Sequence, residues 1–142
     1  MAESQTALFK CHADEVRPAT EWVIGCAAAL GLRDRDPVRL GLAFEEMFAN
    51  TLMHGGVDGA QSIEVRLALD GTELRLDYLD SGVPFDPINA TDEDAGDPRE
   101  GTVGGLGLKL LRWITSRMTY ALEDGRNHVT LWMPLERGAG DD

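Results

Sequence analysis

Near its start the chain has a short apolar stretch, after which apolar residues recur at helical spacing. That stretch, residues 7–13, is predicted to be an edge strand. Residues 14–31 place their apolar side chains three or four positions apart, which predicts a helix. We expect Asp14 to cap this helix, Pro18 to lie in its first turn and Gly31 to end it.

A second helix is predicted from Asp36 to His54, ended by Gly55 and Gly56. At about 100° per residue, one side of this helix is apolar and should meet the core. The residues of this apolar arc are Leu40, Phe44, Met47, Phe48 and Thr51.

Three polar residues recur every four positions along the border of this arc: Glu46, Asn50 and His54. The neighbouring Glu45 projects to the solvent side. A carboxylate base, a neutral amide oxygen and an imidazole in one row suit catalysis or ligand binding. A boundary stripe of satisfied polar residues has the same spacing, so the row alone leaves both interpretations open.

The spacing of apolar residues then changes to two, which is typical of strands with one buried face. Residues 63–69 and 74–80 are predicted to form a hairpin that turns at 70–72. Asp80 continues the inward series that begins with Leu74, Leu76 and Tyr78. A buried carboxylate is costly unless it is paired or hydrogen-bonded. Asp80 is therefore either solvated through a slip of register or held for a partner.

The rest of the chain is predicted to be a loop, a helix and a closing hairpin. Residues 86–103 hold six acids, two prolines and two glycines, which favours a long loop. A third helix, from residue 105 or 106 to about 117, has an apolar face of Leu106, Leu110, Leu111 and Ile114. Residues 118–135 form a hairpin that turns at 124–127, with an inward face of Val129, Leu131 and Met133.

The composition, with 43% hydrophobic and 27% charged residues among 142, is that of a globular protein. We expect one domain over residues 1–136 and a frayed tail over 137–142. Thirteen basic against 25 acidic residues give a net charge of −12, which disfavours direct nucleic-acid binding. The acidity leaves room for a basic protein partner, although a net negative charge that only keeps the protein soluble is the simpler interpretation. Neither a membrane span of about 18 apolar residues nor a secretory signal is recognisable. With only Cys11 and Cys26 to pair, we expect a cytoplasmic protein without disulfides.

A glycine cluster over residues 100–111 opens the third helix. Backbone N–H groups at a helix N-terminus, approached closely through glycines, suit phosphate binding, although a flexible hinge has the same composition. The spacing matches neither a P-loop nor a Rossmann fingerprint. Lys109 is expected to be a surface residue. The scattered His12, His54 and His128 do not suggest zinc, and there is no nucleophile elbow.

The order of these motifs resembles that of the GHKL ATPase superfamily, and more closely its anti-sigma-factor serine/threonine kinases. The similar segments are EEMFANTLMHGG (45–56), LDSGVPFDP (79–87), GGLGLKLLRWITSRMTY (104–120) and DGRNHVTLWMPL (124–135). They cover nearly the whole chain in the right order. The resemblance implies an α+β two-layer sandwich, in which helices cover one face of a mixed, mostly antiparallel sheet.

For the site, the resemblance implies a pocket for ATP and Mg²⁺. Asp80 would accept a hydrogen bond from the adenine amino group, while Gly82 keeps the following turn open. Asn50 would ligate Mg²⁺, and Glu46 would be the general base for the attacking hydroxyl. Further nucleotide contacts are implied for His54, Pro84, Gly104, Gly105, Leu106, Gly107 and Leu108.

The resemblance also implies that residues 86–103 form a lid over the triphosphate, with Arg99 as a candidate phosphate contact. Many superfamily members place a threonine on a late strand beside the adenine-binding acid. Here Asn127 or Thr130 takes that place, and the sequence does not choose between them. In the first helix this sequence has one arginine, Arg17, where relatives often have two. The difference affects the surface that the resemblance implies for binding a partner.

The implied function is that of an ATP-dependent kinase, which phosphorylates a serine or threonine of a STAS-type anti-anti-sigma protein and sequesters a sigma factor as a homodimer. Such transfer works by positioning and charge neutralisation. An alternative is a nucleotide-switched protein-binding module with little or no kinase activity. The catalytic domain of a histidine kinase is disfavoured, because the 35 residues before the second helix are too few for phosphoacceptor helices.

Overall fold

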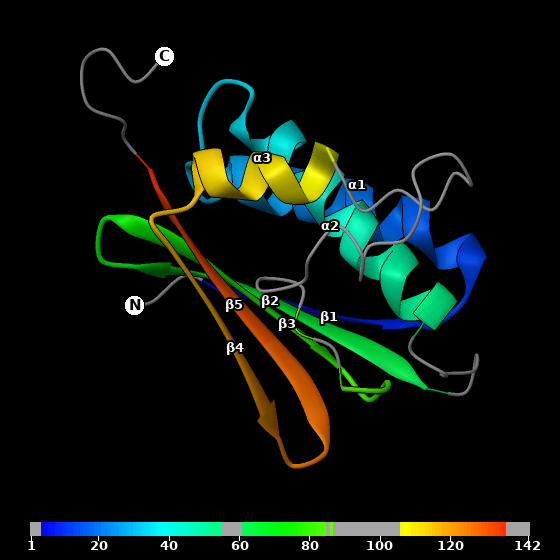
Figure 1. The fold of residues 1–142 in the computed structure, drawn as a ribbon. Helices are drawn as coiled ribbons and strands as arrows, with labels where there is room; N and C mark the ends of the chain where they lie inside the picture. Colours follow the sequence, from blue (N-terminus) through cyan, green and yellow to red (C-terminus); the bar gives the residue numbers. More distant parts are fainter. Residues whose placement is uncertain (1–3, 55–60, 85, 87–105, 136–142) are drawn as a thin grey trace.

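The computed structural model describes residues 4–54, 61–84, 86 and 106–135. Within these residues the chain forms two layers, with three helices on one face of a five-stranded sheet (Figure 1). The helices are α1 (Val16–Ala29), α2 (Asp36–His54) and α3 (Leu106–Ile114). The predicted α+β two-layer fold with helices on one face is confirmed.

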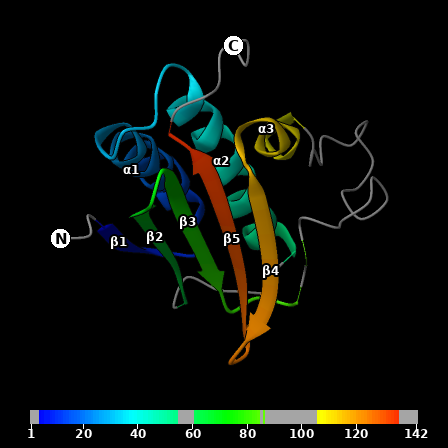
Figure 2. The ribbon, with the colours of Figure 1, turned by 90° about the vertical axis from the view of Figure 1, so that its left-hand side faces the viewer.

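The strands are β1 (Ser4–Lys10), β2 (Ser62–Asp70), β3 (Glu73–Asp80), β4 (Arg117–Glu123) and β5 (Arg126–Pro134). Their order across the sheet is β1-β2-β3-β5-β4 (Figure 2). In this order β3 lies in the middle of the sheet, between β2 and β5. All the pairings among these described strands are antiparallel, so the parallel component of a mixed sheet is not seen in this part of the chain.

The first two elements begin elsewhere than predicted. β1 is an edge strand, as expected, but it covers Ser4–Lys10 rather than 7–13, because it pairs with β2 over that whole length. Asp14 does not cap the first helix. Its backbone N–H instead donates to Nδ1 of His12, which caps a single 3₁₀ turn (Ala13–Glu15) ahead of α1.

The helix ends are set by glycine and by the sheet. Gly31 follows α1 with φ at 114°, a conformation that favours glycine, so the predicted end is confirmed. The bounds of α2 are those predicted, whereas Gly55 and Gly56 lie outside the described residues. α3 ends at Ile114, three residues early, because the backbone N–H of Ser116 donates to the carbonyl of Trp132 and the chain enters β4.

The closing hairpin turns on two residues rather than four. Asp124 and Gly125 have positive φ angles of 52° and 77°. Arg126 pairs with Glu123, so Arg126 and Asn127 belong to β5 and not to the turn. The predicted inward face is confirmed, since the following residues are buried: Val129, Leu131 and Met133. The tight turn places Asn127 opposite Asp80 on β3.

The core lies between the helices and the inward face of the sheet. It includes the four apolar residues of the predicted arc of α2, Leu40, Phe44, Met47 and Phe48, while Thr51 of that arc is a buried polar residue. α1 packs closely on α2 at Gly41, where a Cβ atom would lie 2.5 Å from Cγ1 of Ile24. Cys11 is buried and Cys26 is partly buried, and the two cysteines are not joined by a disulfide bond. Of the helices in the described part of the chain, none combines the length and hydropathy needed to cross a membrane.

Candidate functional site

Asp80 ends β3 on the face of the sheet that meets the helices, and only 6% of the residue is exposed. The predicted inward orientation is confirmed, and the solvated alternative is wrong. Oδ1 accepts hydrogen bonds from the backbone N–H of Gly82 and from Nδ2 of Asn127, both at 2.9 Å. Oδ2 accepts from Oγ1 of Thr51 at 3.2 Å, its only donor within the described residues. Because a carboxylate oxygen has two lone pairs, Oδ2 can accept one more hydrogen bond.

Asn127 faces Asp80 across the β3–β5 ladder and also holds the turn that follows β3. Its Nδ2 lies 3.3 Å from the carbonyl oxygen of Gly82 and 3.1 Å from that of Val83. Thr130 lies on the opposite face of β5, where its hydroxyl donates to Oδ1 of Asp77 at 3.0 Å. Of the two late-strand candidates, the structure therefore brings Asn127 to Asp80 and places Thr130 elsewhere.

A buried threonine and tyrosine connect the helix layer to Asp80. The hydroxyl oxygens of Thr51 and Tyr78 are 2.7 Å apart, and Thr51 also lies 3.1 Å from the carbonyl oxygen of Met47. Burial raises the pKa of Tyr78 well above its usual value; the hydrogen bond with Thr51 opposes this shift, and the charge of Asp80 adds to it. The helical pattern counted Thr51 as part of the apolar arc. Its polar role depends on Asp80 of a distant strand, so spacing could not reveal it.

On α2, Glu46 and Asn50 are half-buried at the border of the apolar arc, while Glu45 is exposed, as predicted. His54 is the last residue of α2, and its side chain lies outside the description. An amide oxygen near a carboxylate fits a hard divalent cation that keeps water and phosphate ligands. Within the described residues, no group of three or more His, Cys, Asp or Glu side chains could hold a metal.

The glycine cluster is described only from the start of α3. The helix begins at Leu106, so its first turn contains Leu106, Gly107 and Leu108, although their side chains lie outside the description. Lys109 is exposed, as predicted. In the turn after β3, Gly82 is buried and Pro84 is exposed. Other predicted features lie outside the described residues: Gly104, Gly105, most of the lid (87–103) with Arg99, and the tail (137–142).

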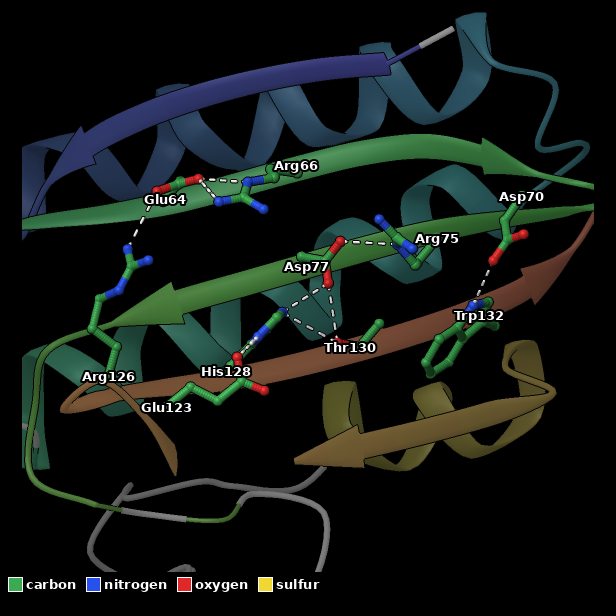
Figure 3. Close-up of polar contacts among 10 residues, drawn as sticks. All are labelled: Glu64, Arg66, Asp70, Arg75, Asp77, Glu123, Arg126, His128, Thr130 and Trp132. Atoms are coloured by element: carbon green, nitrogen blue, oxygen red, sulfur yellow. Dashed lines mark hydrogen bonds and ion pairs between the residues drawn. The ribbon is translucent and has the colours of Figure 1, made fainter. Parts of the chain in front are cut away.

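The outward face of the sheet carries a second polar network, which the sequence pattern did not predict (Figure 3). Oδ1 of Asp77 lies 2.8 Å from Nε2 of His128 and accepts from Thr130, while Oδ2 accepts from Nε of Arg75 at 3.0 Å. The sequence did contain a signal for this network, because polar residues recur at every second position of two strands that pair with each other. Asp77 is buried like Asp80, but its partners lie on the face away from the helices, so it is not part of the candidate site.

The sequence matches the model of the histidine kinase-like ATPase domain over residues 9–133. The chain belongs to this family. The match spans α2, the end of β3 and the start of α3, and thus every described residue of the candidate site. Membership in a family of ATPase domains implies that the chain binds ATP.

A similar protein is the serine/threonine-protein kinase BtrW of Bordetella bronchiseptica. It is 32% identical over 108 residues, which cover 72% of this chain and 76% of that protein. Together with the family match, this similarity confirms the predicted resemblance to GHKL ATPases and their anti-sigma-factor kinase branch.

Two solved structures have a similar fold. The crystal structure of the RsbU and RsbW domains of a Mycobacterium tuberculosis protein matches with a TM-score of 0.66 and 19% identity, over 96% of this chain. This ATPase domain spans about a third (34%) of that mycobacterial chain. The histidine kinase domain of a blue-light activated kinase from Erythrobacter litoralis matches with a TM-score of 0.51 and 18% identity, over 86% of this chain and 60% of that one. At these identities the two structures show the fold alone.

Proposed function

We propose that this chain is an ATP-dependent protein serine/threonine kinase. It transfers the γ-phosphate of ATP to a serine or threonine of a STAS-type anti-anti-sigma partner, and it sequesters a sigma factor as a cytoplasmic homodimer. The observation that carries the proposal is the buried Asp80 carboxylate, with one oxygen held by two donors and the other able to accept from a ligand. The presence of Glu46 and Asn50 on α2 and the similarity to BtrW support the transfer step.

Asp80 gives the pocket its preference for adenine. The amino group of adenine donates an N–H to Oδ2, the oxygen with spare acceptor capacity. The N–H of Gly82 and the amide of Asn127 hold Oδ1, so the carboxylate keeps one orientation when the base arrives. Because the site is buried, an unpaired acceptor facing a wrong base is costly.

Glu46 and Asn50 carry the transfer step. Glu46 accepts the proton of the incoming hydroxyl while the bond from that oxygen to the γ-phosphorus forms and the bond to ADP breaks. Asn50 would hold Mg²⁺ through its amide oxygen, and the ion, when bound, neutralises phosphate charge. The backbone N–H groups at the start of α3, from the glycine cluster over 104–108, bind phosphate oxygens.

Thermal unfolding of the purified protein tests the nucleotide site. ATP at about 100 times its Kd should add roughly 2.7 kcal/mol of stability, a rise in Tm of several degrees. The rise should require magnesium and disappear when EDTA is added. No rise at millimolar ATP would overturn the proposal.

Transfer is tested separately with ATP labelled on the γ-phosphate and with STAS-type proteins from the same organism. We expect the label on a serine or threonine of one of these proteins. Binding of ATP without label on any of them would overturn the kinase assignment. That result would instead assign the chain to the alternative function, a nucleotide-switched protein-binding module.

A further inference from the structure

We propose that Tyr120 and Asn127 act together as positioning residues, which fix the Asp80 carboxylate as an acceptor and so select bases that carry an amino group. The inference rests on the proposed ATP site and adds a structural reason for its base preference. The two residues lie on β4 and β5, whereas Asp80 ends β3, so the β4–β5 hairpin sets the surroundings of the Asp80 carboxylate.

The first step is the orientation of the Asn127 amide. An asparagine can present either its oxygen or its NH₂ group, and only the NH₂ group attracts a carboxylate. Nδ2 of Asn127 faces three acceptors: Oδ1 of Asp80 and the carbonyl oxygens of Gly82 and Val83. A flipped amide would place an oxygen against all three. The acceptors therefore demand one orientation.

The second step is that Tyr120 holds the far side of the same amide. Its hydroxyl donates to Oδ1 of Asn127. In the β4–β5 ladder Leu122 pairs with Asn127, so Tyr120, two residues earlier, lies on the same inward face. The amide is thus held from both ends, with its oxygen on Tyr120 and its NH₂ group on Asp80 and the turn.

The third step is the consequence for Asp80. Two N–H donors, from Gly82 and Asn127, fix Oδ1, and this leaves Oδ2 as the oxygen that meets the base. A fixed acceptor forms a hydrogen bond with a base that has an amino group and therefore binds it more tightly. A base without an amino group forms no such bond and binds less tightly. If Tyr120 no longer holds the oxygen of the amide, Asn127 positions Oδ1 less firmly beside the N–H of Gly82, and the preference for a base with an amino group falls. Tyr120 should therefore change the preference between bases, beyond any effect on folding.

The test compares ATP with purine riboside triphosphate, which lacks the amino group, by measuring Kd for both with magnesium. Wild-type protein should prefer ATP by about tenfold or more, the effect of one hydrogen bond to a charged group. Tyr120→Phe should lower this preference severalfold, chiefly by weakening ATP. Thr119→Val is the matched control, because Thr119 lies on the same strand but faces outward, opposite Thr130. It should leave the preference unchanged.

A second variant distinguishes positioning from a general loss of structure. In an Asn127→Thr background there is no amide to orient, so adding Tyr120→Phe should not change the preference further. Equal weakening of both nucleotides by Tyr120→Phe would overturn the inference, as would a preference that survives it. Wild-type protein that binds neither nucleotide would overturn the ATP site itself, and the inference with it.

Discussion

Thr51 of α2 and Tyr78 of β3 are joined inside the core by a hydrogen bond of 2.7 Å between their hydroxyl oxygens. The same threonine hydroxyl lies 3.2 Å from Oδ2 of Asp80. One hydroxyl group, that of Thr51, therefore connects the helix layer, the middle of the sheet and the acid of the candidate site. The packing of the core and the orientation of Asp80 are coupled through it.

The buried phenol predicts a loss of stability at alkaline pH. Because the pKa of Tyr78 is raised above its ordinary value of 10.0, the folded state keeps this proton longer than the unfolded state. The contribution is complete below about pH 10 and is lost as the pH rises further, by up to about 1.4 kcal/mol per pH unit. Tyr78→Phe should remove this component, as measured by urea unfolding between about pH 8 and 11. Parallel pH profiles for the two proteins would contradict the prediction.

The lowered pKa of Glu64 predicts that the protein also loses stability at acidic pH. Burial alone raises the pKa of Glu64, but the hydrogen bonds and charges of Arg66 and Arg126 outweigh it and lower the pKa below its usual value (Figure 3). This contribution is present above the unfolded pKa and is lost as the pH falls through the folded one. Glu64→Gln should therefore lose less stability than wild type between about pH 6 and 3. Glu45→Gln, at an exposed position, is the control and should follow wild type.

Two glycines should respond in opposite directions to alanine. A Cβ at Gly41 would lie 2.5 Å from Cγ1 of Ile24, so Gly41→Ala should destabilise the protein by about 1–3 kcal/mol through overpacking between α1 and α2. Gly25 has no heavy atom within 4 Å of such a Cβ, so Gly25→Ala should stabilise α1 by up to about 1 kcal/mol. Denaturant unfolding measures both. If Ile24→Ala does not rescue Gly41→Ala, the clash is not the cause.

The sequence predicts those parts of the fold in which apolar residues recur at a regular spacing along the chain. Helical spacing predicted the bounds of α2, and strand spacing predicted the inward face of β5 and the orientation of Asp80. The errors lie at the ends of elements, where a contact from another element decides. Ser116 leaves the helix because it bonds to Trp132, sixteen residues further along the chain.

The candidate site was predictable only in part, for the same reason. Motif order indicated Asp80, Glu46 and Asn50, but it could not choose between Asn127 and Thr130. That choice depends on a hairpin with a two-residue turn, which puts Asn127 opposite Asp80. The contacts of Asn127 join residues more than forty positions apart in the chain, beyond the reach of any local pattern.

The two neighbouring acids of α2 should differ in catalysis. Glu46→Ala removes the proposed base, so phosphate transfer to the STAS-type partner should fall by about 10²–10⁴-fold. ATP affinity should be little changed, because Glu46 acts on the hydroxyl rather than on the nucleotide. Glu45→Ala alters an exposed position one residue away and should leave transfer intact. Label transfer in a single turnover, with ATP affinity titrated in parallel, measures both. Equal loss in the two variants would remove Glu46 from the mechanism.

The two buried acids of β3 should differ in binding. Asp80 and Asp77 are 6% and 5% exposed and lie on opposite faces of the sheet, so they form a matched pair. Asp80→Asn and Asp77→Asn should each cost about 1–3 kcal/mol of stability, because each disturbs a satisfied buried network. Only Asp80→Asn should also weaken ATP, by about tenfold or more, since it removes the acceptor for the amino group. Urea unfolding and nucleotide titration separate the two effects. If Asp77→Asn weakens ATP as much, the loss arises from the fold of the sheet and Asp80 does not contact the base.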